Sequence, residues 1–322
     1  MSRYDRQMIL PFIGAEGQER IGQAHVVVIG AGGLGCPVLQ YLAGAGIGHI
    51  TLLDPDHVEE SNLHRQPLFT MADLGRSKAV AARDRILASN PGIRIDARIA
   101  ALTPANAPAL VATADVVIDA ADSFAVSYTL SDACLAARIP LISASVLGQS
   151  GYVGGFCGPA PSLRAVFPDP PETSESCATA GVLGPAVGAI GAVQAQLALR
   201  TVIDASPGPL GRMLTLDFGT FSFGGFGFMG QPEPACPLPF IASSMLRDGD
   251  RVIELRGRAE APKAITRDAV RISPDAVARL PAGTAGRTVL CCATGLRAWR
   301  AAQVLQNRGF RDLALIAARA DA

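Results

Sequence analysis

The amino-acid sequence predicts an α/β protein with a Rossmann-like, doubly wound, mostly parallel sheet and a second, smaller α/β domain. Two observations support this prediction. Between residues 26 and 144, short apolar runs alternate with helical patterns, as expected for parallel strands joined by right-handed crossovers. The first run also ends in GAGGLG at residues 30–35, a sequence typical of the turn that opens a nucleotide-binding unit.

Each element of this sheet follows from the hydrophobic pattern of its own residues. The expected strands are Val26–Ile29, Ile50–Leu53, Ile93–Ile99, Val116–Ala120 and Leu141–Ala144. The expected helices are Pro37–Ala45, Lys78–Asn90, Pro104–Ala112 and Ser127–Arg138. In a sheet of this kind the ligand lies at the carboxyl ends of the strands.

The next part of the chain is less regular. Residues 151–171 are rich in Gly and Pro and residues 172–180 are polar and small, which predicts a mobile surface segment. Cys177–Leu199 has no charge and is long enough to cross a membrane, but its proline, glycines and glutamines favour a helix buried in a soluble core. Residues 218–239 are again rich in Gly, Phe and Pro, which predicts a domain edge leading into a linker.

Beyond this linker the pattern predicts a small α/β unit. We therefore expect one domain over residues 1–240 and another over residues 243–322. The elements expected in the second are strands at Arg251–Leu255, Thr288–Cys291 and Leu313–Ile316 and an amphipathic helix at Arg297–Arg308.

Composition limits the classes of function. The chain is 49% hydrophobic and 17% charged with a formal net charge of zero, so it lacks an electrostatic footprint for nucleic acid or an anionic membrane. Seven scattered cysteines and an N-terminus without the apolar core of a signal peptide favour a reducing cytoplasm. The expected partners are proteins or small molecules.

The glycine turn and the second strand predict a nucleotide site. Gly30, Gly32 and Gly35 have the spacing that lets a turn tighten, a phosphate approach the backbone and a helix pack on the strand. Asp54 follows the second strand, where its carboxylate either accepts ribose hydroxyls or caps a turn. Any dinucleotide-binding unit would share these features.

Polar residues just beyond Asp54 favour ATP over a nicotinamide cofactor. Transfer at a phosphorus of ATP needs several donors aimed at moving charge, whereas a nicotinamide site needs one modest anion contact. Two cations and two amides lie close in sequence to the turn: Asn62, Arg65, Gln66 and Lys78.

Six motifs in this order resemble the ThiF/MoeB/HesA family, the bacterial relatives of ubiquitin-activating enzymes. Together they are far more specific than a lone glycine turn. The motifs are RYDRQ at Arg3–Gln7, GAGGLG at Gly30–Gly35, DPDHVEESNLHRQ at Asp54–Gln66, GRSKA around Lys78, DAAD at Asp119–Asp122 and CATAGVLGP at Cys177–Pro185.

The resemblance implies an adenylyltransferase reaction. The C-terminal Gly-Gly carboxylate of a ubiquitin-like sulfur carrier protein attacks the α-phosphorus of MgATP and gives an acyl-adenylate and pyrophosphate. This reaction is a step toward a carrier thiocarboxylate of the thiamine or molybdopterin type. The resemblance also implies a homodimer and admits a cysteine desulfurase as the sulfur source.

The resemblance also assigns roles to residues of this sequence. Asp122 is expected to bind Mg²⁺, which prefers oxygen ligands, and Arg6 is expected to reach into the site of the partner subunit. Arg and Lys stabilise the charge that spreads onto the leaving pyrophosphate. The residues expected to bind the nucleotide are Gly30, Gly32, Gly33, Gly35, Asp54, Asp56, Asn62, Arg65, Gln66 and Lys78.

Cys177 and Cys292 are the candidate catalytic thiols. Cys177 lies in a loop of small polar residues, and the matching cysteine of ThiF-like relatives attacks the acyl-adenylate or joins a persulfide link to the carrier; a structural role is the alternative. Cys36 and Cys134 lie in apolar helical contexts and are expected in the core.

The C-terminal unit resembles a short rhodanese domain. VIELRGRAEA at residues 252–261 is similar to an early strand and turn of that fold, and VLCCATGLRA at residues 289–298 is similar to its active-site loop. Cys292 fits the C-x₄-R spacing with Arg297, and a loop of backbone N–H groups can cradle a persulfide anion. Both sulfur transfer and a degenerate structural copy stay open.

Two departures from the family pattern affect these expectations. Most relatives hold zinc with two CxxC pairs. Here Pro161–Ala165 stands at the place of the first pair and Cys236–Pro239 at the place of the second. Because these segments lack the four thiols, we expect no structural zinc. Ser123 and Ser127 replace residues that are usually Asn and Arg in relatives, which predicts reduced activity or an altered partner.

Two other classes of function remain open at this point. One is a non-catalytic protein that keeps the nucleotide fold and binds a carrier. The other is an NAD-dependent oxidoreductase, which only the glycine turn supports.

Overall fold

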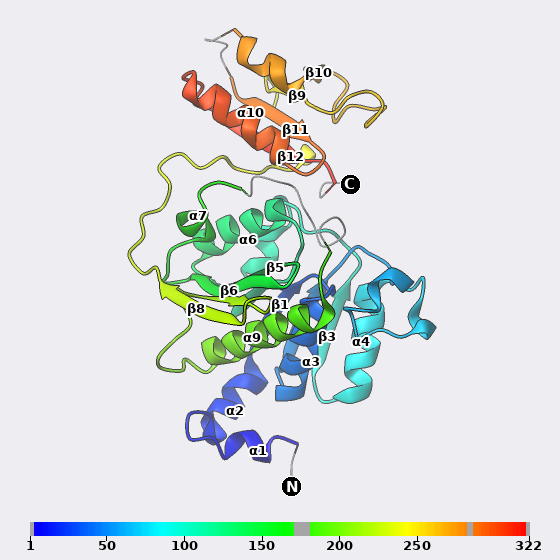
Figure 1. Ribbon diagram of the computed structural model, residues 1–322, viewed down its shortest axis with the longest axis vertical. Helices are drawn as coiled ribbons and strands as arrows, with labels where there is room; N and C mark the ends of the chain where they lie inside the picture. The colour runs from blue at the N-terminus through cyan, green and yellow to red at the C-terminus, as the bar shows by residue number, and fades with distance from the viewer. Residues whose placement is uncertain (1–2, 171–180, 282–285, 320–322) are drawn as a thin grey trace.

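The computed structural model describes residues 3–170, 181–281 and 286–319, and its first sheet has eight strands in the order β3-β2-β1-β4-β5-β6-β7-β8 (Figure 1). Strands β1 to β5 run parallel, whereas β5 to β8 pair antiparallel. The strands are β1 His25–Ile29, β2 His49–Leu53, β3 Arg94–Arg98, β4 Val116–Asp119, β5 Pro140–Leu147, β6 Ser150–Cys157, β7 Arg212–Asp217 and β8 Ser222–Gly227. The predicted parallel, doubly wound sheet is confirmed, and its order reverses between β1 and β4, where such folds bind ligands.

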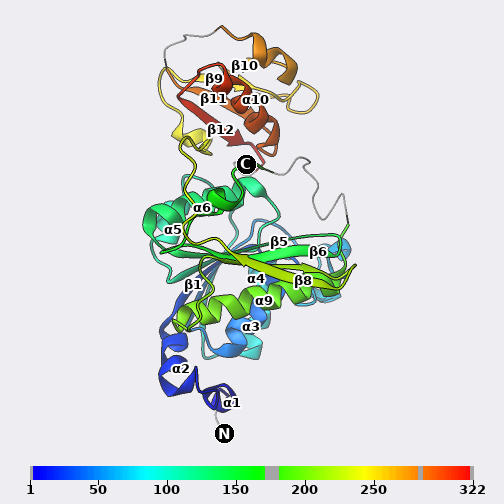
Figure 2. The same ribbon diagram turned by 60° about the vertical axis from the view of Figure 1, so that its left-hand side comes forward.

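Helices cover both faces of this sheet. Figure 2 shows α3 and α9 on one face and α5 and α6 on the other. The helices are α1 Asp5–Met8, α2 Gly14–Gln23, α3 Gly35–Ala45, α4 Lys78–Ser89, α5 Ala107–Val111, α6 Phe124–Ala137, α7 Leu163–Val166 and α9 Gly184–Val202, with short 3₁₀ helices η1 Glu60–Asn62 and η2 Met71–Asp73.

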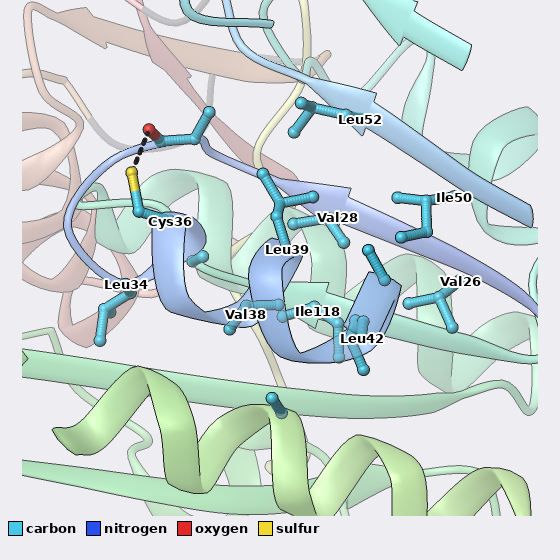
Figure 3. Close-up of a cluster of buried hydrophobic side chains, with 14 of the residues drawn as sticks. Val26, Val28, Leu34, Cys36, Val38, Leu39, Leu42, Ile50, Leu52 and Ile118 are labelled. Carbon is cyan, nitrogen blue, oxygen red and sulfur yellow. Dashed lines mark hydrogen bonds between the residues drawn. The ribbon is translucent and has the colours of Figure 1, made fainter. Parts of the chain in front are cut away.

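Strand β1 is apolar from Val26 to Ile29 because both of its faces are covered there. Val26 and Val28 pack with Leu39 and Leu42 of α3 on one face of the sheet (Figure 3). Val27 and Ile29 belong to the core on the opposite face. Full burial of each such side chain contributes about 1.5–3 kcal/mol. The central strand therefore fixes the place where the glycine turn begins.

The predicted mobile segment over residues 151–171 is wrong in its first part. Residues 150–157 form β6, which pairs with β5 and β7, and Phe156 is fully buried. The glycines there permit close packing rather than motion, because a Cβ at Gly151 would lie 2.3 Å from the Ser145 carbonyl oxygen. Residues 172–180 lie outside the described residues.

The predicted domain edge over residues 218–239 contains a strand that the sequence pattern missed. Strand β8 pairs antiparallel with β7 and forms the outer edge of the sheet. Strands β6 and β8 escaped prediction because their Gly and Phe residues give no clean alternation of apolar and polar residues.

Several helix boundaries also differ from prediction, by one to three residues. Helix α6 begins at Phe124 rather than at Ser127, after Ser123 in an extended conformation. Helix α9 spans Gly184–Val202 and packs on β5 and β6, which agrees with the expected core helix. None of the helices within the described ranges is long and apolar enough to cross a membrane.

The C-terminal residues form a second sheet of four parallel strands in the order β10-β9-β11-β12. Its core is continuous with that of the first sheet, since Trp299 of α10 packs in one cluster with Tyr128 of α6. The elements are η3 Ser243–Met245, β9 Arg251–Glu254, β10 Val270–Arg271, η4 Pro274–Arg279, β11 Thr288–Cys292, α10 Leu296–Asn307 and β12 Leu313–Ala317. The division into domains at residues 240 and 243 stays a prediction.

Replacement of Gln194 tests how α9 is attached to the sheet. The fully buried Gln194 amide donates to the carbonyl oxygens of Asp119 (2.6 Å) and Ile142 (3.0 Å). We expect Gln194→Leu to lower the free energy of unfolding by about 1–3 kcal/mol, because two bonds to buried carbonyls are lost. Urea unfolding followed by circular dichroism measures this, with Gln196→Leu at an exposed site of the same helix as the control. Equal effects of the two substitutions would contradict the role of Gln194.

Candidate nucleotide site

The glycine turn follows β1, leads into α3 and packs against the end of β4. Gly30 has φ +100°, and a Cβ there would lie 2.6 Å from the carbonyl oxygen of Ala120. A Cβ at Gly35 would lie 2.0 Å from the Gly30 carbonyl oxygen, so α3 can start at this point only with glycine. The Cys36 N–H already donates to the Gly32 carbonyl oxygen, and Pro37 has no N–H. The N–H groups that can bind an anion at this edge of the sheet are therefore those of the turn that precedes Cys36.

Asp54 ties this turn to the end of β2. Its carboxylate accepts hydrogen bonds from the Ala31 N–H (2.7 Å) and the Asp56 N–H (2.8 Å), and only 4% of the residue is exposed. Burial raises the pKa of Asp54, and the two backbone bonds oppose that shift. Each carboxylate oxygen keeps a second lone pair, so this bonding leaves ribose binding available.

Lys78 and Asp56 form an ion pair next to the turn. The Lys78 ammonium lies 3.0 Å from the Asp56 carboxylate, and the lysine side chain is buried whereas the aspartate side chain is exposed. Lys78 is the first residue of α4, and its backbone N–H also bonds to the Asp56 carbonyl oxygen. The pair holds a fixed cation beside Asp54.

The segment of Asn62, Arg65 and Gln66 packs against the glycine turn. Gln66 is 3% exposed, and its Oε1 has no hydrogen-bond partner among the described residues. A Cβ added to Gly32 would lie 3.8 Å from the Gln66 Nε2. A Cβ added to Gly33 would lie 3.6 Å from the Arg65 Cγ. A buried amide oxygen without a partner beside a phosphate-type turn fits a bound polar ligand.

Two carboxylates follow β4 at the same edge of the sheet. Asp119 is fully buried and accepts bonds from Ser143 Oγ (2.8 Å) and from the Ala121 N–H (3.3 Å). Burial raises the pKa of Asp119 to about 6. Asp122 lies exposed on the loop before α6. Its position and its oxygen ligands fit Mg²⁺, which usually takes one or two carboxylates with phosphate oxygens.

Asp119 belongs to the DAAD motif, but the sequence pattern predicts no role for it. In the sequence, Asp119 directly continues an apolar strand, and this position indicates that its neighbours are buried. Two serine hydroxyls and one backbone amide surround the Asp119 carboxylate, and among the described residues no cation hydrogen-bonds to it.

Arg6 is not brought to the glycine turn of its own chain. It lies exposed in α1, and its neighbour Gln7 donates to the Ala45 carbonyl oxygen at the end of α3 (2.8 Å). The glycine turn lies at the other end of α3, which is 11 residues long. This length separates the two by about 16 Å along the helix axis. A role for Arg6 in catalysis therefore requires a second copy of the chain.

Of the two candidate thiols, Cys292 lies within the described residues and Cys177 lies outside them. Cys292 is fully buried at the end of β11, and its Sγ accepts bonds from the N–H groups of Gly295 (3.1 Å) and Ala298 (3.4 Å). Arg297, in the first turn of α10, pairs with Glu260. The loop supplies the backbone donors that an anionic sulfur requires. Cys36 and Cys134 are buried, as expected.

The residues at the place of the relatives' zinc cysteines do not fit a zinc site. Only Cys236 offers a thiol there, whereas tetrahedral zinc needs four ligands. Within the described ranges no group of three or more His, Cys, Asp or Glu residues could hold a metal ion. Absence of zinc stays a prediction that elemental analysis can test.

The sheet order, the glycine turn and the charged residues around it define an α/β nucleotide-binding protein. A family model described as the ThiF family matches residues 4–238. The chain belongs to this family.

Named relatives agree with this assignment. The chain is 40% identical over 246 residues to "Sulfur carrier protein adenylyltransferase" of Thermus thermophilus, covering 74% of this chain and 90% of that protein. It is 42% identical over 220 residues to "Adenylyltransferase and sulfurtransferase MOCS3" of Drosophila ananassae, covering 67% of this chain and 49% of that protein. The match therefore spans about half the length of the MOCS3 relative.

Solved structures share the fold. A crystal structure of E. coli MccB with MccA-N7isoASN has a TM-score of 0.64 at 22% identity, covering 73% of each chain. A structure of PaaA has a TM-score of 0.59 at 23% identity, covering 70% of this chain and 73% of that chain.

Protonation of Asp119 should make stability depend on pH. Its carboxyl releases a proton near pH 6 in the folded chain and near pH 4 when unfolded, so burial of its charge destabilises the fold increasingly as pH rises from 4 to 6. Asp119→Asn removes this charge. We expect the unfolding free energy of the variant, relative to wild type, to increase by up to about 3 kcal/mol between pH 4 and pH 7. A relative stability that does not change with pH, in urea titrations, would disprove this.

Proposed function

We propose that this chain uses ATP to adenylate the C-terminal Gly-Gly carboxylate of a ubiquitin-like sulfur carrier protein. The observation that carries the proposal is the set of donors around one glycine turn: Lys78 held by Asp56, the buried Gln66 amide, and Arg65. Similarity to a protein named sulfur carrier protein adenylyltransferase supports the choice of substrate.

The chemistry follows from the charges at this site. A carrier carboxylate oxygen forms a bond to the α-phosphorus while the bond to the bridging oxygen breaks, and pyrophosphate leaves with both bonding electrons. The nucleophile needs no general base because a carboxylate is already an anion at neutral pH. Lys78, Arg65 and the backbone N–H groups of the glycine turn stabilise the negative charge that moves onto the leaving group.

Metal binding and nucleotide placement complete the proposal. Asp122 would hold Mg²⁺ together with phosphate oxygens, and the ion would neutralise charge on the triphosphate. Asp54 would accept the ribose hydroxyls, with Asn62 alongside the phosphates. Arg6 would serve the site of the partner subunit in a homodimer, in keeping with its position at the far end of α3.

We also propose a sulfur-transfer role for the C-terminal domain. Two backbone N–H groups already donate to the Cys292 sulfur, and the same donors would stabilise a persulfide anion there. A cysteine desulfurase would supply the sulfur. Cys177 would attack the acyl-adenylate and displace AMP, and the outer sulfur of the Cys292 persulfide would then displace Cys177 from the resulting thioester. The freed Cys177 thiolate would attack the Cys292 sulfur and break its S–S bond, which releases the carrier thiocarboxylate and leaves a Cys177–Cys292 disulfide.

Lys78→Met tests adenylation directly. Carrier-dependent exchange of labelled pyrophosphate into ATP should fall about 10²-fold or more, because a cation that stabilises the leaving group is lost. Lys263→Met, at an exposed lysine of the C-terminal domain, is the control and should retain the exchange rate. A wild-type chain that binds a carrier without any exchange would instead identify a non-catalytic carrier-binding protein. Tighter binding of NAD than of ATP would point to an oxidoreductase.

Two cysteine variants separate adenylation from sulfur transfer. Cys177→Ala should leave pyrophosphate exchange intact but abolish a covalent carrier adduct, as measured by mass spectrometry of the intact protein. Cys292→Ser should leave exchange intact and lower thiocarboxylate formation by about tenfold or more, since the persulfide cannot form on oxygen. Unchanged thiocarboxylate yield with Cys292→Ser would show that the C-terminal domain is a structural copy.

A further inference from the structure

The segments at the place of the relatives' zinc cysteines are joined here by hydrogen bonds between side chains. Ser162 donates from its N–H (2.7 Å) and from its Oγ (2.5 Å) to the two oxygens of Glu233. Ser162 is 1% exposed, and its Oγ also caps the start of α7. These bonds tie residues 161–165 to the chain just before Cys236.

Arg164 makes the second connection between these segments. Its Nε and Nη2 form a two-point pair with the carboxylate of Asp132 on α6 (2.6 and 2.9 Å). Nη2 also donates to the carbonyl oxygen of Leu238 (3.2 Å), two residues after Cys236. The Arg164 side chain is 3% exposed whereas the Asp132 side chain is 39% exposed, so the charge-assisted pair is shielded from water on the guanidinium side. A guanidinium thus lies where the family's pattern would place metal ligands.

The same guanidinium contacts the C-terminal domain. Its carbon lies 4.4 Å from the ring centre of Tyr128 and 5.7 Å from that of Trp299 on α10. The two rings are themselves 5.7 Å apart. An arginine that is buried against two aromatic rings gains more from these contacts than it would at an exposed site.

Helix α10 bonds to one of these segments and to the chain after α7. Gln306 donates to the carbonyl oxygen of Cys236 (3.1 Å), and Gln303 donates to Asp169, which follows α7 (2.6 Å). These bonds add to the contacts that join α6, the two segments and α10. The helix that follows the Cys292 loop packs on the place where relatives hold a metal.

We propose that Arg164, Asp132, Ser162 and Glu233 form a metal-free clasp that replaces the family's zinc site and docks the C-terminal domain through Trp299. The clasp joins the same two segments that two CxxC pairs would join. It differs from zinc in reaching a third element, α10, because the planar guanidinium can stack on rings while it binds a carboxylate.

Docking by the clasp fixes the position of the Cys292 loop. A Cβ at Gly295 would lie 2.7 Å from the Phe240 ring and 3.4 Å from the Phe124 ring. Phe124 begins α6, two residues after Asp122. The loop is therefore held beside the start of α6, at the edge of the sheet that carries the candidate nucleotide site. The position of the Cys292 loop does not depend on whether the chain adenylates a carrier.

Trp299 is the single tryptophan of the chain and reports on the clasp directly. In the full chain, Arg164→Met should at least double the acrylamide quenching constant of tryptophan fluorescence and shift the emission to longer wavelength. Arg308→Met is the matched control, because Arg308 stacks on Phe310 within the C-terminal domain and is exposed. The control should leave quenching unchanged. A folded Arg164→Met chain with Trp299 as shielded as in wild type overturns the proposal.

Two milder variants keep the proposal testable if Arg164→Met does not fold. Arg164→Lys retains the charge without the two-point geometry, and Glu233→Gln changes only an exposed side chain. Both should increase quenching by smaller factors than Arg164→Met, with far-UV circular dichroism unchanged. Wild-type quenching in both would refute the clasp.

Metal analysis supplies an independent readout. We expect elemental analysis of the purified wild-type chain to find no stoichiometric zinc, and we expect a chelator to leave both the melting temperature and the quenching of Trp299 unchanged. One zinc per chain, or exposure of Trp299 on chelation, would overturn the replacement of zinc by the clasp.

Discussion

The hydrogen bond from the Ala31 N–H to the Asp54 carboxylate holds together the part of the fold on which the candidate site depends. It joins the turn after β1 to the end of β2 and so fixes where α3 begins. Because Asp54 is buried, ionising it costs free energy, and two backbone N–H groups offset that cost. The same turn at the end of β2 positions Asp56, which pairs with Lys78. The Lys78 ammonium is therefore the fixed positive charge of the site.

A second buried carboxylate, Asp119, lies one strand away in a different setting. Hydroxyls of Ser127 and Ser143 and a backbone amide surround it. Burial raises the pKa of this carboxyl, and these hydrogen bonds oppose the shift. The raised pKa lies at the edge of the sheet, three residues before the candidate metal ligand Asp122.

The C-terminal domain is attached through a continuous core and not through a linker alone. Trp299 and Tyr128 share one apolar cluster, and Arg164 lies against both rings. A buried arginine is costly to desolvate, so its carboxylate partner and its carbonyl acceptor are needed for the contact to form. Arg164 thus connects α6, the chain at Leu238 and α10 at one place in the fold.

The sequence by itself determined the parallel half of the sheet, the glycine turn, the strand-end position of Asp54 and the cysteine loop of the C-terminal unit. These follow from local period and spacing, which neighbouring residues set. It did not determine the antiparallel strands β6 to β8, and the glycines of β6, which suggested mobility, serve close packing. Only the tertiary structure decided that Asp119 is buried with no cation hydrogen-bonded to it among the described residues, that Arg6 lies at the far end of α3, and that Arg164 meets Asp132, Leu238 and Trp299. Those contacts join residues far apart in the chain, and only folding brings them together.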